Sequence, residues 1–411
     1  MDAISNGSQA SNRPHAGRWI RASLLRHPSL TVAAVLLIAF NLRPAITPLA
    51  LFLTDIERDL GLSGLQISVL TMTPVICLGA FGPVAPPLAR RFGTETVLLG
   101  SLLALTIGCV VRSFGLAPLF AGTVIIGASM CLLGVLTPVI VKRDFPNHVG
   151  LMMGLYTMLI CLGPAVATST AVPMQHALGD SWERVLLFWG LPALVGAIVF
   201  LPQLFRGEQA SGLAETHVTR VLRDPLAWQV TAYFGFISSL GYDVFNWAPS
   251  MLEARGLDPT ASGVVVSITY IAQMVTGLLA PVVAGRQRDQ RLIIVIAVTL
   301  TAGGLLGFVF APVWSLSLFS VALGLGQGAA FGVGLLLFVL RAGDPHAAAK
   351  LSALAQTIGY LLAGLIGPFA VGVIYDWAGS WPVVAVFYTA VGFGSLIFGL
   401  GAGRARTLRV R

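Results

Sequence analysis

The sequence predicts an all-α polytopic membrane protein, on three observations. Hydrophobic residues make up 56% of the 411 residues and charged residues only 10%, whereas soluble globular domains average about 25% charged residues. The mean hydropathy is +0.85. The apolar residues gather in twelve runs, each with about the 20 residues that a helix needs to cross the hydrocarbon core. We therefore expect twelve transmembrane helices.

The runs form two sets of six, separated by one long polar stretch. The first set lies near residues 30–53, 64–89, 95–113, 117–141, 150–172 and 183–203, and the second near 226–252, 262–284, 292–311, 314–340, 350–375 and 382–402. We divide the chain into a tail (1–29), a six-helix bundle (30–203), a linker (204–225), a second six-helix bundle (226–403) and a short tail (404–411).

The two halves resemble each other at an offset of roughly 200 residues. Pro48 corresponds to Pro249, Ala89-Arg90-Arg91 to the basic stretch 285–288, and Gly163-Pro164 to Gly367-Pro368. Many transporters are built from such internal repeats and bind their solute near the midplane, between the repeats. The pattern predicts two pseudo-symmetric bundles.

Lysine and arginine residues are concentrated on one side of the predicted topology. With a cytoplasmic N-terminus, twenty of the 25 basic residues lie on the cytoplasmic side. The other side holds Arg58, Arg112, Arg184 and Arg255, and Arg43 lies within a span. Because cytoplasmic loops carry the excess of basic residues, we expect both termini in the cytoplasm and the chain in a bacterial inner membrane. The net charge of +8 then reflects topology and not nucleic-acid binding.

The first run contains Arg43 close to its centre. An uncompensated charge at that depth costs at least about 3 kcal/mol, and ionisable residues inside membranes are usually functional. A guanidinium keeps its charge and suits an anion. We expect an anion site here. The alternatives are an ion pair with another helix, or an arginine that extends to the interface.

A polar stripe in the seventh run contains Asp243, an acidic residue well inside a span. Ser239, Asp243, Asn246 and Ser250 follow one another at helical spacing. Asp243 lies at a depth similar to that of Arg43, so the two could pair. The pair would be either a static salt bridge, or a functional one in which Asp243 competes with the solute for Arg43 or takes a coupling proton.

Further polar residues at helical spacing complete the candidate pocket. The candidate substrate-binding residues besides Arg43 and Asp243 are Asn41, Thr47, Gln66, Tyr156, Asn246, Trp247, Gln273, Gln356 and Tyr360. For any one of them the alternative is a hydrogen bond between helices, worth about 0.6 kcal/mol. The residues expected to bend helices are Pro44, Pro48, Gly163, Pro164, Pro249, Gly367 and Pro368.

Features typical of enzymes and pumps are not found in the sequence. There is no P-loop and no Gly-x-Ser-x-Gly motif, and the histidines lack the spacing of partners. The four cysteines fall in apolar runs and give no metal or disulfide pattern. We expect no enzymatic activity, no cofactor and no metal, which leaves transport driven by a gradient.

Several short motifs occur in a characteristic order. They are Asn41-Leu42-Arg43-Pro44, Pro86-Pro87-Leu88-Ala89-Arg90-Arg91-Phe92-Gly93, the stretch from Thr137 to Pro146, Trp247-Ala248-Pro249, and the stretch from Lys350 to Tyr360. Together they resemble the cyanate and 2-nitroimidazole transporter family of the major facilitator superfamily. The resemblance implies alternating access, a cavity lined mainly by spans 1, 2, 4, 5, 7, 8, 10 and 11, and a gating loop with Arg90 and Arg91.

The expected function is secondary active transport of a small anionic or polar solute. The candidates are a cyanate-like anion, a small organic acid and a nitroimidazole-like compound, with protons as the candidate coupling ion and a monomer as the expected state. If Arg43 and Asp243 pair, the nearly neutral cavity favours a zwitterionic, weakly acidic or neutral polar solute. The alternatives are a drug exporter of broad specificity and a membrane sensor that does not transport.

Overall fold

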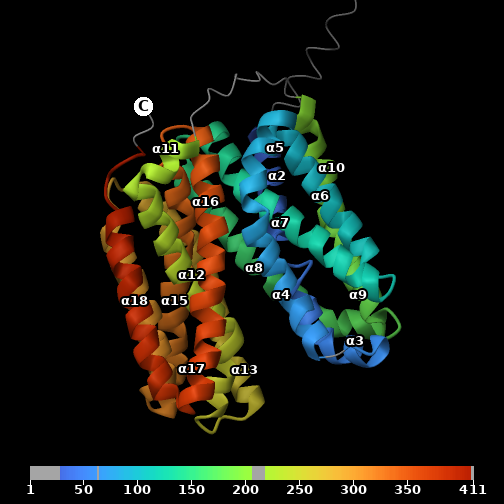
Figure 1. Ribbon diagram of the computed structural model, residues 1–411, viewed down its shortest axis with the longest axis vertical. Helices are drawn as coiled ribbons and strands as arrows, with labels where there is room; N and C mark the ends of the chain where they lie inside the picture. The colour runs from blue at the N-terminus through green and yellow to red at the C-terminus, as the bar shows by residue number, and fades with distance from the viewer. Residues whose placement is uncertain (1–27, 63, 206–217, 409–411) are drawn as a thin grey trace, which may run out of the picture.

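The computed structural model describes residues 28–62, 64–205 and 218–408. All regular elements in these ranges are helices. They form two bundles, one from the N-terminal and one from the C-terminal half of the chain (Figure 1). The predicted all-α, two-bundle fold is confirmed. Residues 1–27, 206–217 and 409–411, which belong to the expected tails and linker, lie outside the described residues.

The first bundle begins with two interrupted spans. The first span consists of α2 (Pro28–Asn41), a turn at 42–46, η1 (Thr47–Phe52) and α3 (Leu53–Leu60). The second consists of α4 (Gly64–Ala80), η2 (Gly82–Val84) and α5 (Ala85–Phe92). The remaining spans are α6 (Thr94–Val111), α7 (Leu116–Asp144), α8 (Val149–Ala177), and α9 (Trp182–Phe188) with α10 (Gly190–Phe200) and η3 (Leu201–Phe205).

The second bundle follows a short helix, α11 (Val218–Arg223), which ends the expected linker. Its spans are α12 (Pro225–Glu253), α13 (Pro259–Gly285), α14 (Arg291–Phe310), η4 (Val313–Ser315) with α15 (Leu316–Leu340), α16 (Pro345–Gly364) with η5 (Leu365–Phe369) and α17 (Ala370–Ala378), and α18 (Trp381–Ala402). Nine segments of the described residues are long and apolar enough to cross a membrane. The other three predicted spans are the interrupted first and second spans and α12.

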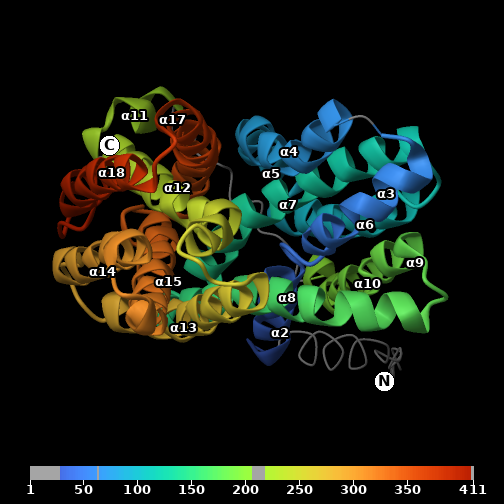
Figure 2. The same ribbon diagram turned by 90° about the horizontal axis from the view of Figure 1, so that it is seen from below.

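The bundles meet at one end and diverge toward the other. In Figure 1 they approach each other where α5 and α11 lie, which we call the α11 end, and separate toward α3 and α17. The most extensive contact between them joins α8 to α13, which adjoin near the middle of Figure 2, and α16 also contacts α4 and α7. Glycines allow this approach, because a methyl group at Gly150 would lie 2.7 Å from the Pro281 carbonyl oxygen.

The residues expected to bend helices behave in two ways. Pro44 lies in the turn that ends α2, and Gly367 has ψ −113° at a kink between α16 and α17, one residue before Pro368. Pro48 lies in η1. By contrast, α8 continues through Pro164 and α12 through Pro249. Gly163 of α8 is needed for close packing, since a methyl group there would lie 2.9 Å from the Pro44 ring.

Candidate functional site

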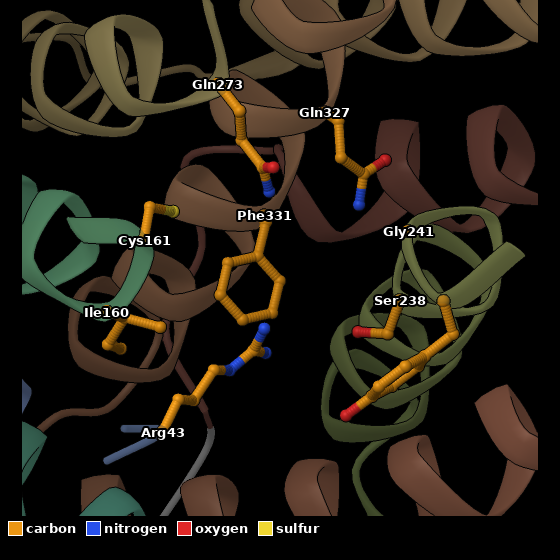
Figure 3. A pocket seen from close by; sticks show the side chains of 9 residues that line it. Arg43, Ile160, Cys161, Ser238, Gly241, Gln273, Gln327 and Phe331 are labelled. Atoms are coloured by element: carbon orange, nitrogen blue, oxygen red, sulfur yellow. The ribbon is translucent and has the colours of Figure 1, made fainter. Parts of the chain in front are cut away.

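The site is built on the break in the first span. After α2 ends at Asn41, the Arg43 carbonyl accepts hydrogen bonds from the Ile46 amide at 3.0 Å and the Thr47 hydroxyl at 2.9 Å. These bonds close a turn around Arg43. Because the turn replaces the regular helix, the guanidinium of Arg43 extends between the two bundles, toward Phe331 (Figure 3).

A second arginine holds the break in place. Arg112, at the end of α6, is 0% exposed and donates hydrogen bonds to the Ala45 carbonyl in the turn and, at 2.8 Å, to the Leu186 carbonyl of α9. Carbonyls freed by a helix break are costly inside a membrane unless another group satisfies them. Arg112 therefore supports the backbone that carries Arg43.

A small cavity lies between the bundles at the tip of Arg43. Its lining residues come from the first-span turn, α8, α12, α13 and α15, and are Arg43, Ile160, Cys161, Ser238, Gly241, Tyr242, Gln273, Gln327 and Phe331. Arg43 is the one charged residue among them. The free space is about 20 Å³, enough for one water molecule. A solute therefore requires the cavity to widen.

Aromatic and hydroxyl groups surround the guanidinium. Its carbon lies 5.9 Å from the centre of the Phe331 ring, in cation–π geometry. The Tyr360 and Tyr242 side chains interact with Arg43 electrostatically, and Tyr156 and Tyr270 also lie within range of its charge. Such neutral, electron-rich groups can surround a cation without carrying a charge that would cancel it.

Four sequence-predicted residues gather here. Arg43 and Gln273 line the cavity, and Figure 3 shows both side chains directed toward the Phe331 ring. Tyr360 interacts with Arg43, and its ring packs edge-on against Tyr242 at 6.3 Å. Tyr156 is buried beside them.

The structure places three other predicted residues away from the cavity lining. Asn41 donates hydrogen bonds to the Leu37 carbonyl and, at 3.0 Å, to the Pro192 carbonyl, so it joins α2 to α10. Thr47 closes the turn at Arg43. Gln66 lies in the first turn of α4.

Three predicted residues on α12 and α16 have local or interhelical partners. Asn246 is exposed and donates to the Tyr242 carbonyl, one turn earlier. The Trp247 indole donates to the Pro368 carbonyl at the kink. Gln356 donates to the Gly134 carbonyl of α7 at 3.1 Å, so it links the two bundles.

Asp243 does not pair with Arg43. It is 1% exposed, its Oδ1 has no hydrogen-bond partner, and it makes no ion pair with any residue of the described ranges. Its charge acts on Tyr388 of α18, whose hydroxyl also lacks a partner. Asp243 therefore lies against α18, on a different face of α12 from the cavity-lining Ser238 and Tyr242. The static salt bridge, one of the two alternatives, is not formed.

Sequence reasoning missed several lining residues. Gln327 donates to the Ile237 carbonyl at 3.1 Å, but its Oε1 and the Ser238 hydroxyl have no partner. Gln327 is the only amide side chain in the run 314–340, a signal that could have revealed it. Phe331 follows one turn later on the same helix, whereas Cys161 and Ile160 resemble ordinary core residues.

The basic residues of the expected gating loop lie at the α11 end. Arg90 and Arg91 are exposed in the last turn of α5. The Arg91 guanidinium lies 5.2 Å from the centre of the Phe92 ring. Arg90 lines a second cavity, together with Lys350 of α16.

Two helical bundles with a small cavity at their interface are consistent with a solute transporter. This chain belongs to the Major Facilitator Superfamily, whose pattern matches residues 30–368, and is therefore a secondary active solute transporter and not an enzyme.

Three similarities support this conclusion. The chain is 35% identical to the 2-nitroimidazole transporter of Escherichia coli (strain K12), over 92% of this chain and 96% of that protein. It is 28% identical to the cyanate transport protein CynX of the same organism, over 89% and 95%. The structure of the proton:xylose symporter XylE matches the fold, over 96% of this chain and 98% of that chain, with a TM-score of 0.72 and 14% identity. The predicted family is confirmed.

Proposed function

We propose that the transporter carries a small anion, bound at Arg43 in the cavity between the bundles. One observation carries this proposal: Arg43 is the one charged group among the lining residues. A planar guanidinium offers two parallel N–H donors to a carboxylate or a similar oxyanion. Because Asp243 lies elsewhere, the nearly neutral cavity expected for a paired Arg43 and Asp243 has no support.

The surrounding groups favour a compact, planar solute. The Ser238 hydroxyl and the Gln327 Oε1 have no partner in the protein, and a buried polar group without a hydrogen bond costs about 1–3 kcal/mol. A bound solute with acceptor and donor atoms would satisfy both. The Phe331 ring beside Arg43 offers a flat apolar face. A small anion would accept from the Ser238 hydroxyl, and a small organic acid that also carries an O–H or N–H group would in addition donate to the Gln327 Oε1.

A ligand-induced thermal shift tests the anion site. Purified protein is heated with cyanate, nitrate or acetate, and the melting temperature is compared with that of ligand-free protein, because a ligand that binds only the native state stabilises it. We expect one of these anions to stabilise the wild type and not the Arg43→Gln variant. The matched control is Arg58→Gln, whose arginine is 72% exposed. Equal stabilisation of the Arg43→Gln variant would refute the proposal.

A neutral planar heteroaromatic solute is the second candidate. The relative named a 2-nitroimidazole transporter and the Phe331 ring beside Arg43 both favour it. The nitro oxygens would accept hydrogen bonds from the guanidinium. In the same assay, stabilisation by 2-nitroimidazole without stabilisation by any anion selects this candidate.

We further propose that Asp243 binds the coupling proton. A buried carboxyl with no cationic partner is costly when ionised, and α12 carries Asp243 on one face and the cavity residues Ser238 and Tyr242 on another. A movement of α12 would therefore couple the two sites. We expect Asp243→Asn to flatten the pH dependence of transport in proteoliposomes while anion binding persists. The matched control is Asp376→Asn, an exposed aspartate in the same half. Unchanged pH dependence in Asp243→Asn would contradict the assignment.

The remaining proposals concern the membrane location, the orientation of the chain and its oligomeric state. The charge distribution supports a bacterial inner membrane with the α11 end and both termini in the cytoplasm. A monomer is the proposed functional unit, since the cavity described above is built entirely from one chain.

A further inference from the structure

A second, larger cavity lies at the α11 end, away from Arg43. It has a volume of about 420 Å³ and lies where three parts of the chain meet. The first bundle contributes three prolines and Arg90 from η2 and α5. The short helix α11 contributes Val221 and Leu222, and the second bundle contributes one face of α16. The cavity is therefore shared by both halves and the end of the linker.

The lining has two distinct parts. Most of it is apolar, with Pro83, Leu222, Leu354 and Ile358 among the residues. Arg90 and Lys350 add two positive charges, close enough to each other that Arg90 repels the charge on Lys350. Neither makes a hydrogen bond or an ion pair within the described ranges, and none of the lining residues is acidic. Asp344 also lies within range of the Lys350 charge, but its carboxylate already accepts hydrogen bonds from the His346 and Ala347 amides at the start of α16.

This combination indicates a ligand that carries both an anionic and an apolar part. Two like charges beside an apolar wall are unfavourable when left alone. An amphiphile with an anionic head and a hydrocarbon chain would offset the charges of Arg90 and Lys350 and cover the wall.

Exposed aromatic residues place the cavity near the membrane interface. Trp228, in the first turn of α12, is 43% exposed, and its indole donates to the Leu222 carbonyl. Phe92, at the end of α5, is 54% exposed. Tryptophan and other aromatic residues concentrate at the depth of lipid headgroups, and basic pockets between helices bind anionic headgroups there.

We propose that this cavity binds an anionic phospholipid, with the phosphate held by Arg90 and Lys350 and part of an acyl chain along Leu222 and Leu354. The site differs from the solute site in position and ligand, and does not depend on the proposed anion transport. Because its walls come from both bundles, the bound lipid stabilises the arrangement in which the bundles meet at the α11 end.

The test measures thermal stabilisation of the delipidated full-length protein in a neutral detergent. Phosphatidylglycerol is the probe, phosphatidylcholine with the same chains removes the net charge, and glycerol 1-phosphate removes the chains. We expect stabilisation by phosphatidylglycerol alone. Equal effects of phosphatidylcholine, equal effects of glycerol 1-phosphate, or no effect of any of the three would each overturn the proposal.

Variants distinguish lipid binding at this cavity from the general attraction of an anionic lipid to exposed basic residues. The double variant Arg90→Gln with Lys350→Gln should bind phosphatidylglycerol roughly 10- to 30-fold more weakly, as expected for two basic residues near a membrane surface. The matched control is Arg286→Gln with Arg288→Gln, two exposed arginines after α13. If the double variant fails to fold, Leu222→Gln, at a residue that is 42% exposed, tests the apolar wall and should also weaken binding. Equal loss of binding in the arginine control, or no loss in the cavity variants, would contradict the site.

Discussion

Several arginines whose side chains point into the protein donate hydrogen bonds to backbone carbonyls, whereas Arg43 lines the cavity between the bundles. Arg255 donates to the Phe308, Val309 and Ala311 carbonyls that end α14. Arg341 donates to the Ala402 and Gly403 carbonyls at the end of α18. A guanidinium has five donors, so carbonyls at helix ends can satisfy it without an acidic partner. This explains how Arg255 and Arg341 are accommodated by helix ends.

Arg112 provides a prediction at this scale. Arg112→Gln removes charged donors from the Ala45 and Leu186 carbonyls, and hydrogen bonds to charged groups contribute about 1.5–3 kcal/mol each. We expect a lower melting temperature and, because the turn holding Arg43 loosens, weaker binding of the stabilising anion. The control is Arg184→Gln, whose exposed guanidinium donates to the nearby Leu178 carbonyl. An Arg112→Gln variant with unchanged melting temperature and binding would show that the turn does not need this support.

At the scale of elements, the interrupted helices and the helices that pack closely through glycines have separate roles. The first and eleventh spans break next to the site, at residues 42–46 and at Gly367. In contrast, α8 and α13 approach each other closely through glycines. A methyl group at Gly154 would overlap the Leu278 carbonyl, and one at Gly285 would lie 2.7 Å from the Gly150 Cα. The broken spans position side chains, whereas the glycine surfaces let the bundles touch and separate.

The contact between α8 and α13 gives a second prediction. Gly154→Val places three carbon atoms where the α13 backbone lies, and overpacking of this kind costs about 1–3 kcal/mol. We expect a lower melting temperature and slower transport in proteoliposomes, because the bundles cannot close fully at this contact. Gly303→Val on α14 is the control, since a side chain there meets nothing within 4 Å. Equal effects of the two substitutions would attribute the loss to valine itself and not to the contact.

At the scale of the whole molecule, polar side chains link the bundles near the α11 end. Lys142 of α7 donates to the Val339 carbonyl of α15 at 3.2 Å, and Gln356 of α16 donates to the Gly134 carbonyl of α7 at 3.1 Å. Both bonds would break if the bundles separated at this end. They therefore stabilise the closed arrangement that Figure 1 shows.

The third prediction concerns this arrangement. Lys142→Gln with Gln356→Leu removes both bonds, each worth about 0.6 kcal/mol inside a membrane, so the ratio of open to closed molecules should rise roughly 5- to 10-fold. The measurement is the distance between spin labels at Arg91→Cys and Arg286→Cys, in a protein whose four native cysteines are replaced by alanine. Arg291→Gln, which removes an exposed ion pair with Asp289 within one bundle, is the control. An unchanged distance distribution would show that these two hydrogen bonds do not stabilise the closed arrangement.

The sequence by itself determined the membrane class, the twelve spans, the two halves and the presence of a charged arginine, Arg43, inside the first span. These follow from local properties, since hydrophobic length, helical spacing and the cost of a buried charge are all readable along the chain. Only the tertiary structure decided which polar groups meet. Asn41 and Gln356 turned out to join helices, Asp243 faces Tyr388 and not Arg43, and Gln327 and Phe331 of the tenth span line the cavity although the sequence singled out neither. The physical reason is that depth in the membrane follows from sequence position, whereas the face that each helix presents depends on packing against helices far away in the chain.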